Sequence, residues 1–129
     1  MLCLQAKFVY RDLRIQNTAC SVEAPLRWFL LDLECCAKDG APAPQSLRTS
    51  HAPGVLVNGR FTAASDLSLL GQLLWRHERM VTSALGREFL DAIHVPAVEQ
   101  LAAQELLQHP WIGCQGPHCK EAGAWPGEL

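Results

Sequence analysis

The sequence predicts a mainly α-helical domain with a short β element near its N-terminus. Three observations support this: apolar residues recur at helical spacing between residues 65 and 109, an apolar run of strand length lies at residues 27–33, and a Pro-, Gly- and Ser-rich stretch separates the two. A chain of 129 residues has the length of one domain and is expected to form one core.

The N-terminal part contains one clear strand signal and one long loop. The run Arg27-Trp28-Phe29-Leu30-Leu31-Asp32-Leu33 is aromatic and aliphatic, which predicts a buried strand that ends on an acid. Residues 38–54 are rich in Pro, Gly and Ser, so a loop is expected there, and Asn58-Gly59 is a second turn signal.

The C-terminal part predicts three helices. Ser65 is the expected N-cap of the first helix, with Asp66 in its first turn. Gly86 is the weak point of the second, and Pro96 suits the first turn of the third, which should run to His109-Pro110. The apolar faces are Leu67, Leu70, Leu73, Leu74 and Trp75 in the first helix, Val81, Leu85, Phe89 and Ile93 in the second, and Val98, Leu101, Ala102 and Leu106 in the third.

Charge and hydropathy exclude some classes of function. Eleven Lys and Arg against 13 Asp and Glu give a net charge of −2 without a long basic run, so nucleic-acid binding has no electrostatic support. The first residues are too few and soon too polar for a signal peptide, and no apolar run approaches the roughly 18 residues of a membrane span. A cytoplasmic protein with no membrane partner is expected, with its six cysteines reduced.

The segment Tyr10-Arg11-Asp12-Leu13-Arg14-Ile15-Gln16-Asn17 carries the clearest chemical signal, because it resembles the catalytic loop of a eukaryotic protein kinase. Four further segments resemble motifs of that family in the family's order. They are Asp32-Leu33-Glu34 for DFG, Ala52-Pro53-Gly54 for APE, Asp66 to Gly71 for the buried helix of the family, and Gln100 to Trp111 for the late motif that ends in His-Pro-Trp. Residues 1–112 are therefore expected to form a kinase-like C-terminal lobe, followed by a loose tail at residues 113–129.

The resemblance implies roles for four residues. Asp12 would be the catalytic base for a substrate hydroxyl, and Arg14 the cation that meets the transferring phosphate. Asn17 and Asp32 would bind Mg²⁺ and, through it, the cofactor ATP. The expected partner is a protein, and Arg14 does not decide between serine/threonine and tyrosine substrates. Arg11 resembles the arginine that pairs with a phosphorylated loop, for which the hydroxyl candidates are Ser46, Thr49 and Ser50.

Several family features differ in this chain. Gly54 and Gln100 stand where the family commonly has a buried Glu and Arg pair, and losing both partners can be nearly neutral. A double back-substitution, Gln100→Arg with Gly54→Glu, is then expected to restore stability that Gln100→Arg alone removes. Glu34 replaces the DFG glycine, which stiffens that turn.

The chemistry also lacks essential parts. Only nine residues precede Tyr10, without the Gly-rich loop, strand Lys and helix Glu of a kinase ATP site, so inactivity in isolation is expected. The alternative is a non-catalytic, pseudokinase-type interaction module with the same fold. A zinc site at Cys114, His118 and Cys119, with Cys35 or Cys36, has poor support from spacing. The remaining residues are expected to be structural, namely Trp28, Trp75 and Trp111 in the core and His109 in the late motif.

Overall fold

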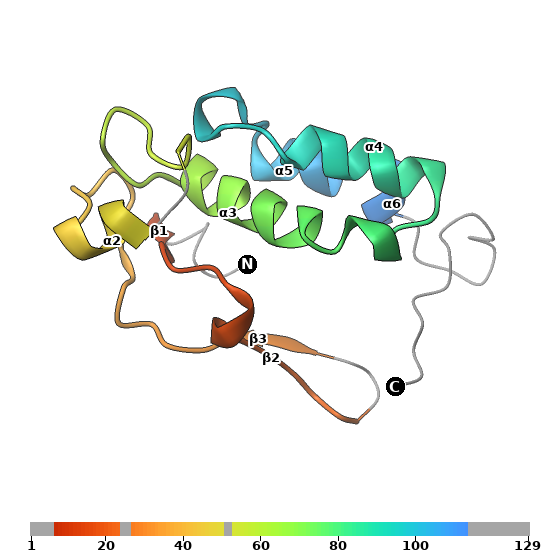
Figure 1. Ribbon diagram of the computed structural model, residues 1–129, viewed down its shortest axis with the longest axis horizontal. Coiled ribbons are helices and arrows are strands. Elements are labelled where there is room, and N and C mark those ends of the chain that lie inside the picture. Colours follow the sequence, from red (N-terminus) through yellow and green to blue (C-terminus); the bar gives the residue numbers. More distant parts are fainter. Residues whose placement is uncertain (1–6, 24–26, 51–52, 114–129) are drawn as a thin grey trace.

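The computed structural model describes residues 7–23, 27–50 and 53–113. Within these ranges, five α-helices accompany two small antiparallel sheets, so the fold is mixed, with its β structure in the N-terminal part as predicted. In Figure 1, α3 and α4 lie side by side, and the β2–β3 hairpin lies below them. The elements are β1 (Phe8–Val9), β2 (Thr18–Cys20), β3 (Trp28–Leu30), β4 (Ala37–Lys38), α2 (Gln45–Ser50), α3 (Ala63–Trp75), α4 (Ala84–Ile93), α5 (Ala103–Leu107) and α6 (Pro110–Gly113), with 3₁₀ turns η1 (Ile15–Asn17), η2 (Glu78–Met80) and η3 (Ala97–Glu99).

Helix α3 is the central element. It begins at Ala63, with Thr62 as N-cap, so the predicted N-cap at Ser65 is wrong by three residues. The hydroxyl of Ser65 instead accepts a hydrogen bond from the backbone N–H of Thr62 at 3.0 Å, which stabilises the helix start from the third helical position. A Cβ at Gly71 would overlap the backbone carbonyl of Ile93, so this glycine allows α3 and α4 to pack closely.

Two hydrophobic clusters lie on different sides of α3. The first joins β1 and the segment before α3 to one face of the helix, through Val9, Val55, Phe61 and Leu69. The second joins α4 to the late motif, and its partly buried members include Leu67, Leu70 and Leu74 of α3. One buried helix therefore connects the segment of residues 10–17 with the C-terminal helices. The centre of the second cluster is Phe89, Ile93 and Leu106.

The strand at residues 27–33 forms, but its predicted burial is wrong. Trp28, Phe29 and Leu30 make up β3 and are 66%, 50% and 45% exposed. Strand β2 supplies hydrogen-bonding partners along one edge, but the side chains of β3 remain largely exposed. Trp28 is therefore no core residue, and Trp75 is also exposed, stacked on His94 with ring centroids 4.2 Å apart.

Residues 38–54 are not a continuous loop. Helix α2 occupies Gln45–Ser50, directly after Pro44, whose carbonyl accepts a hydrogen bond from the N–H of Leu47 at 3.1 Å. Ala43 and Leu47 are buried in the first cluster, and this tertiary contact stabilises a short helix that the composition does not predict.

The second predicted helix is confirmed as α4, and the third is broken. In α4 the Ser83 hydroxyl caps the helix by accepting from the N–H of Gly86, where a Cβ would collide with the side chain of Val81. The third segment contains η3 and the separate α5, with Gln100 extended between them. Of its predicted apolar face, Leu106 is buried, while Val98, Leu101 and Ala102 are exposed.

The late motif nevertheless packs as a unit. The ring of His109 meets Phe89 edge-on, with centroids 5.3 Å apart, and Trp111 contacts the same phenylalanine at 5.2 Å.

No helix among the described residues is long and apolar enough to cross a membrane. The predicted loose tail lies outside the described residues from position 114 onward, beyond the end of α6.

Candidate active site

Backbone N–H groups of residues 10–17 bind a side chain at the N-terminal end of α3. One carboxylate oxygen of Asp66 accepts a hydrogen bond from the N–H of Tyr10 at 2.6 Å, and the other accepts from the N–H of Arg11 at 2.8 Å. Two segments that the sequence singled out separately, more than fifty residues apart, therefore meet in a bidentate contact.

Burial of Asp66 has an electrostatic consequence. Loss of solvent raises the pKa of this carboxyl, and the two backbone hydrogen bonds oppose the shift only in part. The charged form of Asp66 is thus held in place by the N–H groups it binds, while its surroundings disfavour the charge. The sequence analysis assigned Asp66 to the buried-helix motif but not to the candidate active site. Its position at the start of that helix was the signal that could have indicated a structural role.

Arg11 is buried and fixes the loop from the other side. Its backbone is in the left-handed region, with φ of 72°, and its guanidinium lies over the ring of Phe61 at 5.9 Å. Its Nε donates to the carbonyl of Cys35, and an Nη donates to the carbonyl of Pro42 at 3.5 Å. The guanidinium therefore links the loop to the segment between β3 and α2. The hydroxyl residues once expected to pair with it, Ser46, Thr49 and Ser50, belong to α2 rather than to a loop.

Asp12 lies at the centre of the predicted catalytic residues. Its side chain is almost fully buried, and the amide nitrogen of Asn17 donates to its Oδ2 at 2.9 Å and to its backbone carbonyl at 3.0 Å. The guanidinium of Arg14 forms an ion pair with the same Oδ2 at 2.8 Å, and this arginine side chain is 57% exposed. The 3₁₀ turn η1 folds the chain back so that Asn17, five residues on, reaches Asp12. The structure thus joins all three predicted catalytic residues in one hydrogen-bonded cluster.

Asp32 lies next to this cluster. It directly follows Leu31, the residue after β3, and has a left-handed backbone with φ of 56°. The phenol of Tyr10 donates to the carbonyl of Leu31, which connects the loop to the peptide before Asp32. Burial raises the pKa of Tyr10, and the negative charges of Asp12 and Asp32 raise it further, since both carboxylates lie near the phenol. Left-handed backbone at non-glycine residues is strained and concentrates at functional sites.

Asn17 and Asp32 carry the oxygen atoms that the resemblance assigns to a cation. The side-chain nitrogen of Asn17 donates to Asp12, and Asp32 is exposed, with Oδ1 accepting from the N–H of Glu34 at 3.2 Å. Magnesium is commonly bound by one or two such oxygens together with substrate phosphates and water. Among the described residues, no group of three or more His, Cys, Asp or Glu side chains could hold a metal by itself. Of the zinc candidates, Cys35 and Cys36 are partly buried, and Cys114, His118 and Cys119 lie outside the described residues.

Gly54 and Gln100, which stand where the kinase family commonly has a buried ion pair, lie close together. The carbonyl of Gly54 accepts from the N–H of Ala97 at 2.7 Å, and Gln100 follows three residues later with its Nε2 donating to the carbonyls of Ile93 and Val95 at 2.6 and 3.1 Å. The Oε1 of Gln100 is buried without a partner. Gly54 has φ of 89°, and a Cβ there would lie 3.3 Å from Pro96, so backbone strain and crowding oppose the rescue expected from Gly54→Glu.

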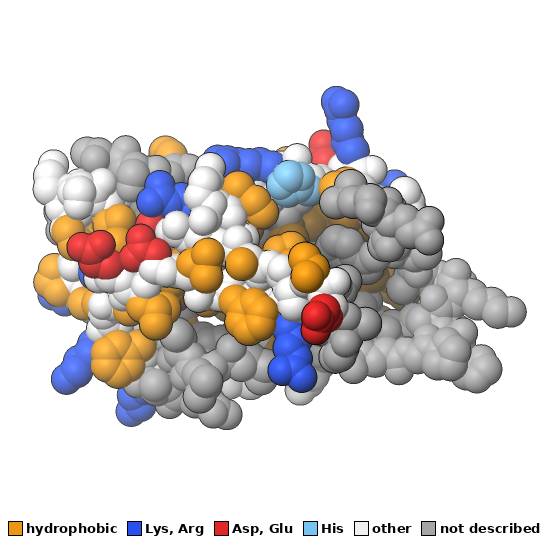
Figure 2. All heavy atoms as spheres, turned by 90° about the horizontal axis from the view of Figure 1, so that it is seen from below, with side chains coloured by type: hydrophobic (Ala, Val, Ile, Leu, Met, Phe, Trp, Pro, Cys, Tyr) orange, Lys and Arg blue, Asp and Glu red, His pale blue; other side chains and the backbone are white. Residues whose placement is uncertain are grey.

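An apolar groove lies beside the catalytic cluster, and the sequence did not predict it. Its volume is about 530 Å³, and its walls come from the hairpin and loop on one side and from α3, η2 and α4 on the other. Figure 2 views the molecule from the side of the hairpin and shows hydrophobic side chains gathered on that face. The groove is lined by Leu13, Ile15, Thr18, Trp28, Leu30, Leu70, Leu73, Leu74, His77, Met80, Val81, Thr82, Ser83, Leu90 and Trp111.

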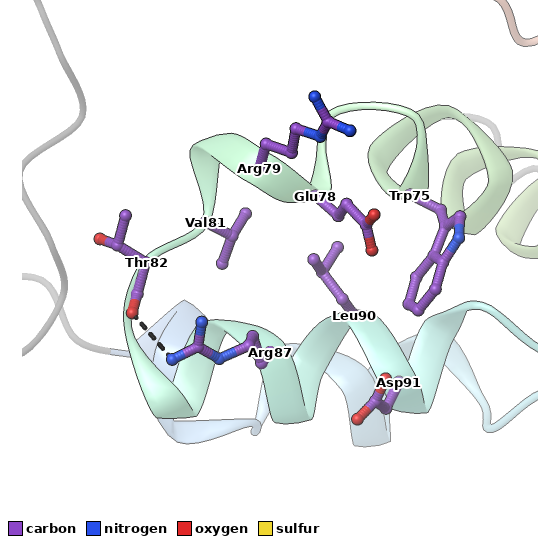
Figure 3. A pocket seen from close by; sticks show the side chains of 8 residues that line it. All are labelled: Trp75, Glu78, Arg79, Val81, Thr82, Arg87, Leu90 and Asp91. Carbon is purple, nitrogen blue, oxygen red and sulfur yellow. Dashed lines mark hydrogen bonds between the residues drawn. The ribbon is translucent and has the colours of Figure 1, made fainter.

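A second, more polar hollow adjoins the apolar groove. Its volume is about 330 Å³, and it shares Val81, Thr82 and Leu90 with the groove. Figure 3 shows Arg87 reaching the carbonyl of Thr82, a hydrogen bond of 3.2 Å, with Trp75 on the opposite side of the hollow. Two arginines and two acids line this hollow, so its charges balance and favour neither anions nor cations. The charged residues are Glu78, Arg79, Arg87 and Asp91.

No protein-family model matches the chain, and no curated protein matches it either. The functional interpretation therefore rests on the residues of the cluster and on their geometry.

Proposed function

We propose that this chain provides the catalytic loop and the metal-binding aspartate of a protein-kinase-like phosphotransferase. The observation that carries the proposal is the cluster of Asp12, Arg14 and Asn17 on a loop whose backbone is bound by Asp66. A carboxylate, a cation and an amide oxygen are the groups that phosphoryl transfer to a hydroxyl requires at these positions.

Each residue of the cluster has a role that its contacts support. In this proposal Asp12 accepts the hydrogen bond of a protein hydroxyl and orients it toward the phosphorus, while Asn17 keeps the carboxylate in position. Arg14 is exposed enough to turn from Asp12 toward the transferring phosphate. Asn17 and Asp32 hold Mg²⁺, which supplies charge neutralisation for the phosphates of ATP when both are bound. These 129 residues contain no Gly-rich loop and no lysine at the spacing of a kinase ATP site, so the proposal assigns the chain no transfer activity in isolation.

A second candidate is a non-catalytic interaction module, and the apolar groove favours it. A contiguous apolar hollow on a small domain commonly marks a site for another protein segment. This function needs the fold and the groove but neither Asp12 nor Asp32.

Thermal denaturation with and without Mg²⁺ and ATP distinguishes the two candidates. A ligand at 100 times its Kd stabilises a protein by about 2.7 kcal/mol, which is measurable as a rise in Tm. We expect a rise for the native chain that is absent in Asp32→Asn. The matched control is Glu88→Gln, which neutralises an exposed acid of α4 and should leave the rise intact. A native chain without any rise favours the interaction module, and an equal rise in all three proteins contradicts the assigned nucleotide site.

A further inference from the structure

Strand β3 has one edge that no other strand covers among the described residues. Its sheet contains two strands, so β2 pairs with one edge of β3 and leaves the opposite edge free. At the two ends of the hairpin, the N–H of Ser21 donates to the carbonyl of Arg27 at 2.9 Å, and the N–H of Leu31 donates to the carbonyl of Asn17 at 2.8 Å. Hydrogen-bonded positions alternate along an antiparallel pair, so residues 27, 29 and 31 face β2.

The residues between these positions, Trp28 and Leu30, direct their backbone N–H and C=O groups away from β2. No other segment of the described chain forms a hydrogen bond with these groups. An exposed strand edge is a template for a further strand, and proteins commonly protect it with proline or charged side chains. Residues 28–31 contain neither, and the exposed fractions are 66% for Trp28, 50% for Phe29, 45% for Leu30 and 46% for Leu31. This edge is therefore suited to a partner strand.

We propose that β3 pairs with β3 of a second copy of this chain, antiparallel and across a two-fold axis at Phe29, so that the two hairpins form one continuous sheet. In this register Trp28 lies opposite the partner's Leu30, and the two residues exchange both of their N–H···O bonds. The two-fold axis repeats this pair, so every free backbone group of Trp28 and Leu30 gains a partner. Phe29 meets its own counterpart at the closer, non-hydrogen-bonded position, where aromatic pairs are stabilising.

Self-complementarity and area favour a second copy as the occupant of this edge. The same three residues supply the donors, the acceptors and the apolar side chains on both sides of the axis, as an isologous contact requires. A tryptophan or phenylalanine can bury about 150–250 Å², so the exposed fractions of residues 28–31 correspond to roughly 400 Å² in one copy and roughly 800 Å² in a pair. This area is below the roughly 1,200 Å² of a stable interface, so the dimer should be weak and depend on protein concentration.

The dimer goes beyond both candidate functions of the chain. Residues 28–30 include none of the predicted catalytic set of Asp12, Arg14, Asn17 and Asp32. The contact also uses the backbone edge of the hairpin, so it requires no occupant of the apolar groove. Its success or failure is therefore distinct from that of the proposed nucleotide site.

Sedimentation equilibrium of the full chain, from micromolar to millimolar concentration and with the thiols reduced, measures the dimer. We expect the average mass to rise from that of one chain toward that of two. Leu30→Pro removes an outward N–H that β2 does not use, so the hairpin is retained while the dimer dissociation constant rises at least tenfold. The matched control is Leu30→Ala, which loses the same side chain but keeps the N–H, and it should dimerise more tightly than Leu30→Pro. Far-UV circular dichroism checks that both variants are folded.

A second pair of variants tests the register without a proline. Phe29→Lys and Phe29→Glu each place like charges opposite one another at the two-fold axis, which opposes dimerisation. An equimolar mixture places Lys opposite Glu and should associate at least tenfold more strongly than either variant by itself at low ionic strength.

Four results would overturn the proposal. The first is a native chain that stays monomeric over the whole concentration range. The second is equal association of Leu30→Pro and Leu30→Ala, which places the contact on another surface, such as the apolar groove. The third is a mixture of the Phe29 variants that associates no more strongly than its components. The fourth is an average mass that rises beyond two chains, because a two-fold contact closes at the dimer.

Discussion

Asp66 is the residue whose replacement tests the architecture of the site most directly. In Asp66→Ala the N–H groups of Tyr10 and Arg11 lose their acceptors, and each buried donor without a partner costs about 1–3 kcal/mol, so the expected loss is about 2–6 kcal/mol. Asp66→Asn retains one acceptor oxygen and presents an amide group to the other N–H, so about half of that loss is expected.

Urea denaturation at pH 7 measures this loss. With a slope of about 1–3 kcal/mol per molar urea for a small protein, Asp66→Asn should lower the midpoint by about 1 M. The matched control Asp91→Asn replaces an exposed acid of α4, and surface changes of this type usually stay within about 0.5 kcal/mol. An Asp66→Asn protein as stable as this control would refute the idea that Asp66 holds the loop.

The pH dependence of the same variant tests the electrostatics. Because burial raises the folded-state pKa of Asp66 above the unfolded value of about 3.9, the stability from this group is fully present below the unfolded pKa. It is lost as the pH rises through the folded pKa. The free-energy difference between the native chain and Asp66→Asn should therefore shrink as the pH rises through that window. A difference that grows with pH would show that the two backbone hydrogen bonds outweigh burial.

Three further predictions follow from individual contacts. Gly71→Ala should destabilise the fold by about 3 kcal/mol or more, measured by urea denaturation, since its Cβ overlaps the carbonyl of Ile93, which is backbone and cannot move aside cheaply. Tyr10 is the single tyrosine, so absorbance at alkaline pH follows its ionisation alone, and the pKa of the phenol should lie above the ordinary value of 10. The stability that comes from this raised pKa is present below the unfolded-state pKa and is lost as the pH rises through the folded-state pKa. Gln100→Arg should lower the Tm by burying a cation, and adding Gly54→Glu should lower it again rather than restore it; recovery in the double variant would show that the backbone at φ of 89° adapts.

The sequence by itself determined the elements whose signals are local. The spacing of leucines from Leu67 to Leu74 predicted α3, and the four-residue repeat through Phe89 predicted α4, because helical periodicity is a property of neighbouring residues. The order of short motifs also predicted Asp12, Arg14 and Asn17 as one catalytic group, since all three lie within a stretch of six residues.

Tertiary structure alone decided the features that depend on distant segments. The apolar composition of β3 predicts a strand but cannot say what covers it, and Trp28, Phe29 and Leu30 remain 66%, 50% and 45% exposed. Gln100 has an extended backbone between η3 and α5, and its side chain donates to the carbonyls of Ile93, the last residue of α4, and of Val95. Most decisively, Asp66 looks like an ordinary first-turn acid in the sequence. Its role as the acceptor for the loop appears only when the fold brings Tyr10 and Arg11 to the start of α3, where two buried N–H groups need a partner.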